Sequence, residues 1–187
     1  MTQAPPRPPL ATEGLVSHTE EARLGAAPDA LWSWFVATPL EAMLPGGGGL
    51  PKVTRTEPLD GPPWGEVGAG RRVFLEDGTS VAEAITEAAP PRLFRYQVWG
   101  FEGLPARLLS HAQGEFVFDA AGGGAALRWT YAFKPRSGLL RPLVGLFVRR
   151  QFAPFMRAGL GVMTARAAAD LGDHAGSAPH STREDDR

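Results

Sequence analysis

The chain has 187 residues, of which 43% are hydrophobic and 9% aromatic, and its 19 basic and 20 acidic side chains give a formal net charge of −1. This length and composition suffice for one globular domain with an ordinary core. The near-neutral charge argues against the positive field that nucleic-acid binding requires, and the lack of cysteine removes disulfides and thiolate chemistry. The four histidines lack the spacing of metal ligands, so we expect neither a metal nor a tightly bound cofactor.

The first residues, MTQAPPRPPLATEG, place prolines where a signal peptide needs an unbroken apolar stretch, and no later run of about 18 uncharged apolar residues could span a bilayer. We therefore expect a cytoplasmic protein without stable membrane insertion, of unknown oligomeric state. Residues 1–15 are rich in proline and small residues, and residues 173–187 are polar and charged, so neither segment can bury enough apolar area to offset chain entropy. The sequence predicts two disordered tails around one ligand-binding domain at 16–172.

The first predicted elements are a strand and short helices. VSHTEEARLG is typical of an edge strand, and four apolar residues then recur at helical spacing behind a Pro28-Asp29 start: Leu31, Trp32, Phe35 and Val36. This predicts one or two short helices. The glycine run at 46–49 breaks the chain, after which LPKVTRTEPL predicts a second strand and DGPPWGEVGAG a loop.

From Arg71 to Pro135 the pattern changes to strands at short intervals. RRVFLE and SVAEAITEA flank Asp77-Gly78, a strong hairpin signal, and LFRYQVWGF follows the Pro90-Pro91 break. Two further strands lie in GEFVFDAAGGGAALRWTYAF, and their apolar faces predict a register. That register pairs Phe118 with Leu127, Phe116 with Trp129, and Gly114 with Tyr131. Gly114 would leave space beside a ring, and the whole chain supplies about seven antiparallel strands.

The only long helical stretch is RPLVGLFVRRQFAPFMRAGLGVMTARAAADL, which Pro154 should kink or divide. An apolar stripe at spacings of three or four follows its second part: Phe152, Met156, Leu160 (or Gly159), Met163 and Ala167. From Pro154 to Leu171 the helix would be about 27 Å long at about 1.5 Å per residue, which is enough to cross a twisted sheet.

This order of elements resembles the SRPBCC or START-like superfamily, in particular its polyketide cyclase/dehydrase-type branch. The resemblance covers roughly residues 17–171 and is carried by EARLGAAPDALWSWF, EDGTSVAEAITEAAPPRLFRYQVWGF, GEFVFDAAGGGAALRWTYAF and the final helix. It implies an α+β helix-grip fold: a curved antiparallel sheet of about seven strands around a long C-terminal helix, with two short helices after the first strand. It also implies a cavity between sheet and helix, which in relatives holds sterols, lipids, polyketides or other apolar molecules. Trp129 and Tyr131 match aromatic positions of the family's late strand and Phe116 one of the strand before it; no catalytic residue carries over.

The candidate ligand-binding residues are the aromatic and flexible apolar side chains expected near such a cavity: Phe116, Phe118, Trp129, Tyr131, Tyr96, Met156, Leu160 and Met163. The alternative is that these rings simply pack against the last helix, as in an ordinary core. A buried tyrosine hydroxyl needs a partner, and for Tyr131 this could be a ligand or water. The strand at 93–99 could instead turn Arg95, Gln97 and Trp99 inward.

Two titratable residues are candidates for chemistry. Glu83 lies on a strand face with two apolar residues, and if that face points inward it supplies a buried carboxylate that could accept a proton. We favour a solvated Glu83 at a sheet edge, or one paired to Arg72 or Arg95, because unpaired buried glutamates are rare. His111 precedes a predicted strand, where a base could reach a cavity mouth, but a histidine without a recognisable partner is more typical of a surface loop.

The segment RSGLLRPLVGLFVRRQF combines arginines with leucines and other apolar residues. It could touch an anionic membrane while a lipid moves in or out, or form an amphipathic lid over the cavity with arginines facing water. We favour the lid, because its apolar residues are needed to close the fold.

The leading hypothesis is a protein that binds a small apolar or aromatic, lipid- or polyketide-like molecule. The second is a cyclase, aromatase or dehydratase-type enzyme in which Tyr131, Glu83 or His111 shuttles protons, which a cavity with several inward polar groups would favour. The third is a cochaperone-like interaction module, which a collapsed pocket beside an exposed apolar patch would favour.

Overall fold

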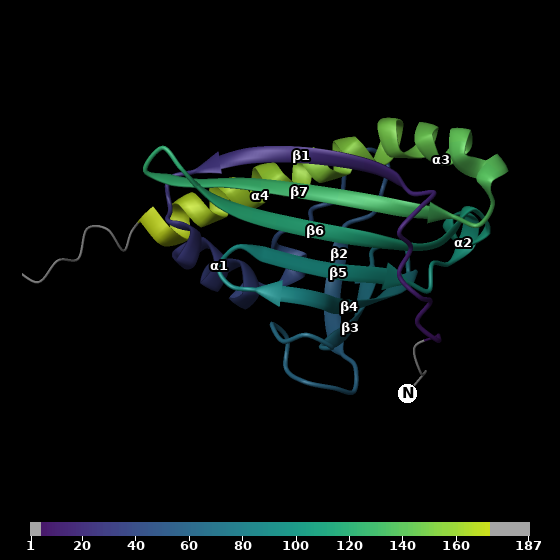
Figure 1. Cartoon of the computed structure of the whole chain (residues 1–187), viewed down its shortest axis with the longest axis horizontal. Coiled ribbons are helices and arrows are strands. Elements are labelled where there is room, and N and C mark those ends of the chain that lie inside the picture. The colour runs from purple at the N-terminus through teal and green to yellow at the C-terminus, as the bar shows by residue number, and fades with distance from the viewer. Residues whose placement is uncertain (1–4, 173–187) are drawn as a thin grey trace, which may run out of the picture.

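The computed structural model describes residues 5–172, and the expectations for residues 1–4 and 173–187 lie outside them. One seven-stranded sheet, in the order β1-β7-β6-β5-β4-β3-β2, curves around the C-terminal helix (Figure 1). Its strands are β1 Val16–Leu24, β2 Val53–Pro58, β3 Gly70–Leu75, β4 Ser80–Ala89, β5 Leu93–Trp99, β6 Leu109–Ala121 and β7 Gly124–Pro135. Every neighbouring pair is antiparallel, so the predicted curved sheet around a terminal helix is confirmed.

Two short helices follow β1, as predicted, and an unpredicted one lies between β5 and β6. The helical segments are α1 Pro28–Ala37, the 3₁₀ turns η1 Leu40–Ala42 and η2 Gly138–Leu140, α2 Gly103–Leu108, α3 Arg141–Phe147, the π turn η3 Val148–Phe152 and α4 Ala153–Gly172. With six residues and an internal proline, α2 is too short to show a helical period in the sequence. Within residues 5–172, no helix combines the length and apolarity needed to cross a bilayer.

The C-terminal helical stretch was predicted to kink or divide at Pro154; it instead continues from α3 through η3 into α4 and contains a π turn just before that proline. Pro154 has no N–H to donate to the preceding turn, and there the hydrogen bonding widens from the α to the π pattern. The Ala153 N–H accordingly donates to the carbonyl of Val148. The predicted stripe on α4 is buried throughout: Phe152, Met156, Gly159, Leu160, Met163 and Ala167.

The predicted register of β6 against β7 is confirmed at all three pairs: Phe118 with Leu127, Phe116 with Trp129, and Gly114 with Tyr131. The glycine leaves room for a ring from the neighbouring strand. A Cβ atom at position 114 would lie 2.0 Å from Cζ of Tyr96, so only glycine fits beneath that ring.

The glycine run at 46–49 serves a close approach of the chain to the C-terminal helical region. Gly48 has a φ of +61°, and a Cβ atom there would lie 2.1 Å from the carbonyl oxygen of Gln151. The segment between α1 and β2 is thereby held against η3 and the start of α4.

Residues 5–13 lie across the convex face of the sheet, opposite the face covered by α4 (Figure 1). The Trp99 indole N–H donates to the carbonyl of Pro5, and the amides of Gln97 and Gln113 donate to those of Pro8 and Ala11. A disordered tail was expected over residues 1–15, and the described part of it, from residue 5, is instead held against the sheet. A proline-rich segment has few N–H groups but keeps its carbonyl acceptors, which these side-chain donors satisfy.

Candidate ligand-binding site

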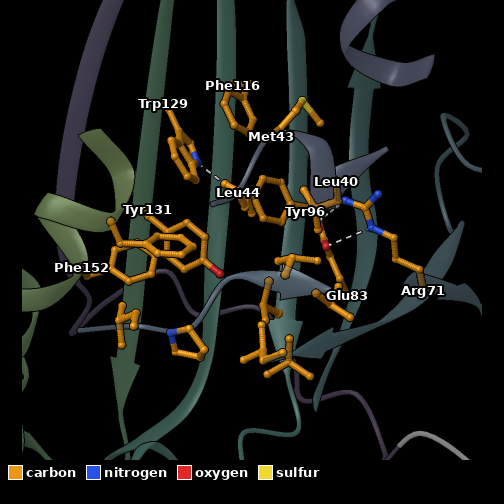
Figure 2. Close-up of a pocket in the computed structure, with 18 of the residues that line it drawn as sticks. Leu40, Met43, Leu44, Arg71, Glu83, Tyr96, Phe116, Trp129, Tyr131 and Phe152 are labelled. Atoms are coloured by element: carbon orange, nitrogen blue, oxygen red, sulfur yellow. Dashed lines mark hydrogen bonds and ion pairs between the residues drawn. The ribbon is translucent and has the colours of Figure 1, made fainter. Parts of the chain in front are cut away.

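A cavity of about 180 Å³ lies on the concave side of the sheet (Figure 2). Strands β3 to β7 supply one wall, and the segment from Phe35 to Val53 with parts of α2, α3, η3 and α4 supplies the other. An apolar protein cavity of about 150 Å³ accommodates benzene, so this space holds a small organic molecule of about that size or slightly larger. The cavity is therefore large enough for a ligand.

The predicted ligand-binding residues divide into two groups. The following line the cavity: Tyr96, Phe116, Trp129, Tyr131 and Met163. The other three, Phe118, Met156 and Leu160, are buried in the core but do not border the cavity. Further rings that the sequence reasoning did not single out also line it: Phe35, Trp64, Phe94, Phe101, Phe133, Phe147, Phe152 and Phe155.

Strand β5 turns Phe94, Tyr96 and Val98 inward, which resolves the choice of face that the sequence left open. Tyr96 is held by its neighbours. Its ring lies over Gly114, and its hydroxyl accepts a hydrogen bond of 3.0 Å from the indole N–H of Trp129. Trp129 in turn stacks on Phe116, with ring centroids 5.0 Å apart and planes at 14°. These contacts make one wall of the cavity aromatic and rigid.

The hydroxyl of Tyr131 points into the cavity (Figure 2). Its ring packs on Phe152, with centroids 4.6 Å apart, but among residues 5–172 the hydroxyl has no hydrogen-bond partner. The oxygen is not sealed away by protein atoms, because no buried polar side-chain atom in that range lacks a partner. Burial, and secondarily the Glu83 carboxylate, raises the pKa of Tyr131 well above its ordinary value, so the phenol is neutral and able to donate.

Glu83 also faces the cavity, so the expected solvated position is wrong. It is 5% exposed and lies directly opposite Arg71 in the β3–β4 pairing. The Arg71 guanidinium bonds both carboxylate oxygens of Glu83: Nε lies 3.2 Å from Oε2, and Nη2 lies 3.3 Å from Oε1. The guanidinium also lies 3.5 Å from the ring centroid of Trp64. Glu83 is therefore a buried, paired carboxylate on the cavity wall.

Glu83 pairs with Arg71 and not with the expected Arg72 or Arg95. For Arg72, the length of the hairpin loop is the reason. A two-residue loop at Asp77-Gly78 would set Arg72 opposite Glu83. In the structure the Leu75 N–H donates to the carbonyl of Thr79, and the pairing is offset by one residue, which brings Arg71 to that place and turns Arg72 to the other face. Arg95 instead bonds Glu87 and Glu115.

His111 is neither at the cavity mouth nor in a loop. Because β6 begins at Leu109, earlier than predicted, His111 lies within that strand on the convex face, 3% exposed. Its Nδ1 lies 3.0 Å from the Ser110 hydroxyl, and its Nε2 lies 3.3 Å from the side-chain amide nitrogen of Gln113. Burial, and then the charge of Lys134, lowers the pKa of His111. It takes no part in the cavity.

The polar groups on the cavity wall are few and lie together. They are chiefly the Arg71–Glu83 pair and the hydroxyls of Tyr96 and Tyr131, surrounded by rings and aliphatic side chains. Thr38 also lines the cavity, but its hydroxyl donates to the carbonyl of Trp34. Burial is also the main cause of the raised pKa of Tyr96, so both phenols are neutral hydrogen-bonding groups. Within residues 5–172, no three His, Asp or Glu side chains come together in a group that could hold a metal ion.

The sheet, the C-terminal helix and the cavity between them define a helix-grip protein. The matching family is described as polyketide cyclase / dehydrase and lipid transport, and its match covers residues 16–168. The chain belongs to this family, as the sequence resemblance indicated. The comparison with curated proteins gives no match.

Solved structures with the same fold are distant in sequence. Norcoclaurine synthase from Thalictrum, a point mutant in complex with a transition-state analogue, is 14% identical with a TM-score of 0.64, covering 84% of this chain and 96% of that one. The di-domain ARO/CYC protein StfQ from the steffimycin biosynthetic pathway is 15% identical with a TM-score of 0.62; the match covers 84% of this chain and 52% of StfQ. Major latex-like protein 151 from Panax ginseng is 12% identical with a TM-score of 0.61, covering 83% and 99%. At these identities the similarity establishes the fold alone.

Proposed function

We propose that this protein binds a small apolar or aromatic molecule, lipid- or polyketide-like, in the cavity between the sheet and the C-terminal helix. The observation that carries this proposal is the Tyr131 hydroxyl, which faces an aromatic cavity and has no partner among residues 5–172. A phenol that reaches an apolar cavity without a protein partner is free to donate a hydrogen bond, which a ligand carbonyl or hydroxyl would accept. The cytoplasmic location expected from the sequence is part of the same proposal.

The lining and size of the cavity support a proposal for the ligand's shape and polarity. Its walls are aromatic and aliphatic, and its polar groups other than the internally bonded Thr38 are those of Tyr131, Tyr96 and the Arg71–Glu83 pair. A matching ligand is an apolar body with one polar end, oriented by hydrogen bonds and held by ring contacts. A volume of about 180 Å³ favours one or two rings, unless the covering segments move apart.

Native mass spectrometry of the protein purified from its own host tests the proposal. A retained small molecule, released on denaturation and identified by its mass, would support it and name the ligand class. Protein that carries nothing and that also fails to take up an apolar fluorescent probe would overturn it. The matched variants for this experiment are Tyr131→Phe and Tyr96→Phe, since only the second hydroxyl bonds another protein group.

An enzyme of cyclase, aromatase or dehydratase type is the second candidate, and the inward polar groups favour it. A neutral phenol can donate a proton to a carbonyl, and the Glu83 carboxylate can accept one. Incubation with a polyketide-like chain, followed by mass spectrometry, would reveal loss of water. Under this hypothesis Glu83→Gln abolishes product formation but retains probe binding. An unchanged substrate after incubation with wild-type protein that binds it would leave the binding function alone.

The third hypothesis, a cochaperone-like interaction module, would be favoured by a collapsed pocket beside an exposed apolar patch. The open space beside Tyr131 argues against it.

A further inference from the structure

Three leucines at the start of the C-terminal helical region face away from the protein. Leu139 is 90% exposed, Leu143 48% and Leu146 39%. Their spacing of four and three residues places them on one side of η2 and α3. Exposed leucines are ordinary when scattered, but three on one helix face form a continuous apolar surface.

A fourth leucine belongs to the same end of the molecule. Leu104 on α2 is 67% exposed. The chain around Arg136 links α2 to η2, because the Arg136 side chain donates to the carbonyl of Ala106 and its backbone N–H to that of Leu108. Figure 1 shows α2 and α3 at the same end of the sheet. We call Leu104, Leu139, Leu143 and Leu146 the leucine patch.

The fold does not need the leucine patch for its own closure. The opposite side of the same helical segment already supplies the packing residues: Val144 is 0% exposed and Val148 2%. Phe147 packs there too, against Phe133 and Phe152 at centroid distances of 5.5 and 6.1 Å. The expectation that all apolar residues of this segment close the fold is therefore wrong, because its helix is apolar on two sides.

The chain segment that carries three of the four leucines has charges of one sign. From Lys134 to Ala169 the chain carries seven basic residues and no aspartate or glutamate, although its net charge is −1. Arg157 is paired with Glu20. Three others, Arg141, Arg149 and Arg150, are exposed on the segments that carry the leucines. Exposed leucines and exposed arginines thus lie on the same segments, η2, α3 and η3.

We propose that the leucine patch and its arginines dock this protein on the surface of an anionic lipid bilayer. Leucines at the boundary between headgroups and acyl chains bury apolar area, while the arginines contact anionic headgroups. A second copy of this chain is a poorer occupant, because a twofold contact sets each patch against itself and so opposes arginine to arginine. The bilayer satisfies both features without that repulsion.

Docking there would bring the cavity close to the lipid. The half-buried Phe101, Pro105 and Phe147 line the cavity and belong to or adjoin the same helices, α2 and α3, that carry the patch. An apolar ligand could then pass between bilayer and cavity without crossing water. The docking itself goes beyond the proposed function, since it depends on the outer surface and not on what the cavity holds.

Vesicle flotation with ligand-free lipids tests the proposal. The full chain is mixed with vesicles of phosphatidylcholine alone, or of phosphatidylcholine with phosphatidylserine, at low and high salt. We expect binding to the anionic vesicles at low salt, weaker binding at high salt, and little binding to neutral vesicles. Equal binding to both lipids, or none to either, overturns the proposal, and neither result affects the ligand-uptake test of the cavity.

Two double variants and a charge-matched control locate the surface. Arg149→Glu with Arg150→Glu is expected to weaken binding about tenfold or more, since each basic residue near an anionic surface contributes about fivefold. Leu139→Ser with Leu143→Ser should also weaken it, while leaving the thermal unfolding midpoint unchanged. The control, Arg23→Glu with Arg128→Glu, changes two exposed arginines on β1 and β7 and should bind nearly as wild type.

The outcomes are decisive for the location. An equal loss in the control double variant would show a non-specific charge effect and overturn the docking site. Self-association that the leucine variant abolishes, without vesicle binding by the wild type, would assign the patch to a dimer and overturn it as well. If the leucine variant unfolds, the arginine pair, which leaves the packing untouched, carries the test.

Discussion

The concave face of one sheet is filled at one end and hollow at the other. At the filled end, Phe118 packs against Trp32 and Phe35 of α1, with centroids 5.6 and 5.4 Å apart. At the hollow end, Tyr131 and Glu83 face a cavity. Both ends carry aromatic side chains, and they differ in the elements that pack over them. A regular helix presses side chains into the first region, whereas η1 and a glycine-rich loop cover much of the second.

This difference separates stability from binding within a single hydrophobic cluster. Side chains at the filled end have protein neighbours on all sides, so their removal leaves a void. Side chains at the hollow end already border space, so their polar atoms can be changed with little effect on packing. Substitutions at the two ends should therefore produce opposite patterns of effect.

The largest effect on stability is expected from Phe118→Ala at the filled end. Phe118 is 2% exposed and does not border the cavity. Its truncation should lower the free energy of unfolding by about 3–5 kcal/mol, measured by urea denaturation. Under conditions where the variant remains folded, uptake of an apolar fluorescent probe should match the wild type. Loss of uptake by fully folded protein would contradict the separation of the two ends.

Gly114→Ala should damage both properties, because this position lies beneath the Tyr96 ring. The added Cβ would lie 2.0 Å from Cζ and 2.4 Å from the hydroxyl oxygen of Tyr96, so the ring must move into the cavity. We expect a loss of about 1–3 kcal/mol in unfolding free energy from the forced repacking. Probe uptake should fall as well. Gly138→Ala, where a Cβ meets nothing within 4 Å, is the control.

The register around Gly114 shows what the sequence can predict. Strand β7 alternates from Leu127 onward, and Phe116 and Phe118 mark the matching face of β6, so pairing these faces sets the contacts of Phe116 and Tyr131 across the hairpin. The same reasoning places the buried stripe of α4, whose period of three to four residues is a property of the helix alone. A sequence pattern with one buried face is therefore enough to predict the sheet, the helix and most of the aromatic wall of the cavity.

The position of Glu83 could not be predicted in the same way, because β4 is buried on both faces. Ala82 and Ala84 are buried on the convex side with Trp99. The sequence of β4 therefore does not indicate which of its two faces points to the cavity. A single residue of offset in the Asp77-Gly78 loop then decides which arginine lies opposite. The N-terminal segment that covers the convex face makes its contacts through backbone carbonyls, which no residue pattern reveals.

The two cavity tyrosines allow a sharper test within the hollow end. Tyr96→Phe leaves the Trp129 indole N–H without its acceptor and should lower the unfolding free energy by about 1–3 kcal/mol. Tyr131→Phe removes a hydroxyl that bonds no described residue, so stability should change by less than about 0.5 kcal/mol. Its affinity for the native ligand should nevertheless fall about two- to tenfold, measured by calorimetry. Unchanged affinity in Tyr131→Phe would contradict the proposed role of its hydroxyl.

The smallest effect is expected on the convex face, which lies on the other side of the sheet from the cavity. Burial and Lys134 lower the pKa of His111 in the folded protein, so below about pH 6.5 the unfolded chain takes up a proton at this residue before the folded one does. Stability should therefore fall as the pH drops from about 6.5 towards the lowered folded pKa, and should recover none of it at still lower pH. His111→Gln, which keeps a polar side chain of similar reach, should flatten that part of the stability profile, measured as unfolding midpoints against pH. Ligand affinity at neutral pH should stay unchanged, because His111 is separated from the cavity by the sheet. If the stability of His111→Gln falls with pH as steeply as that of the wild type, groups other than His111 produce the slope.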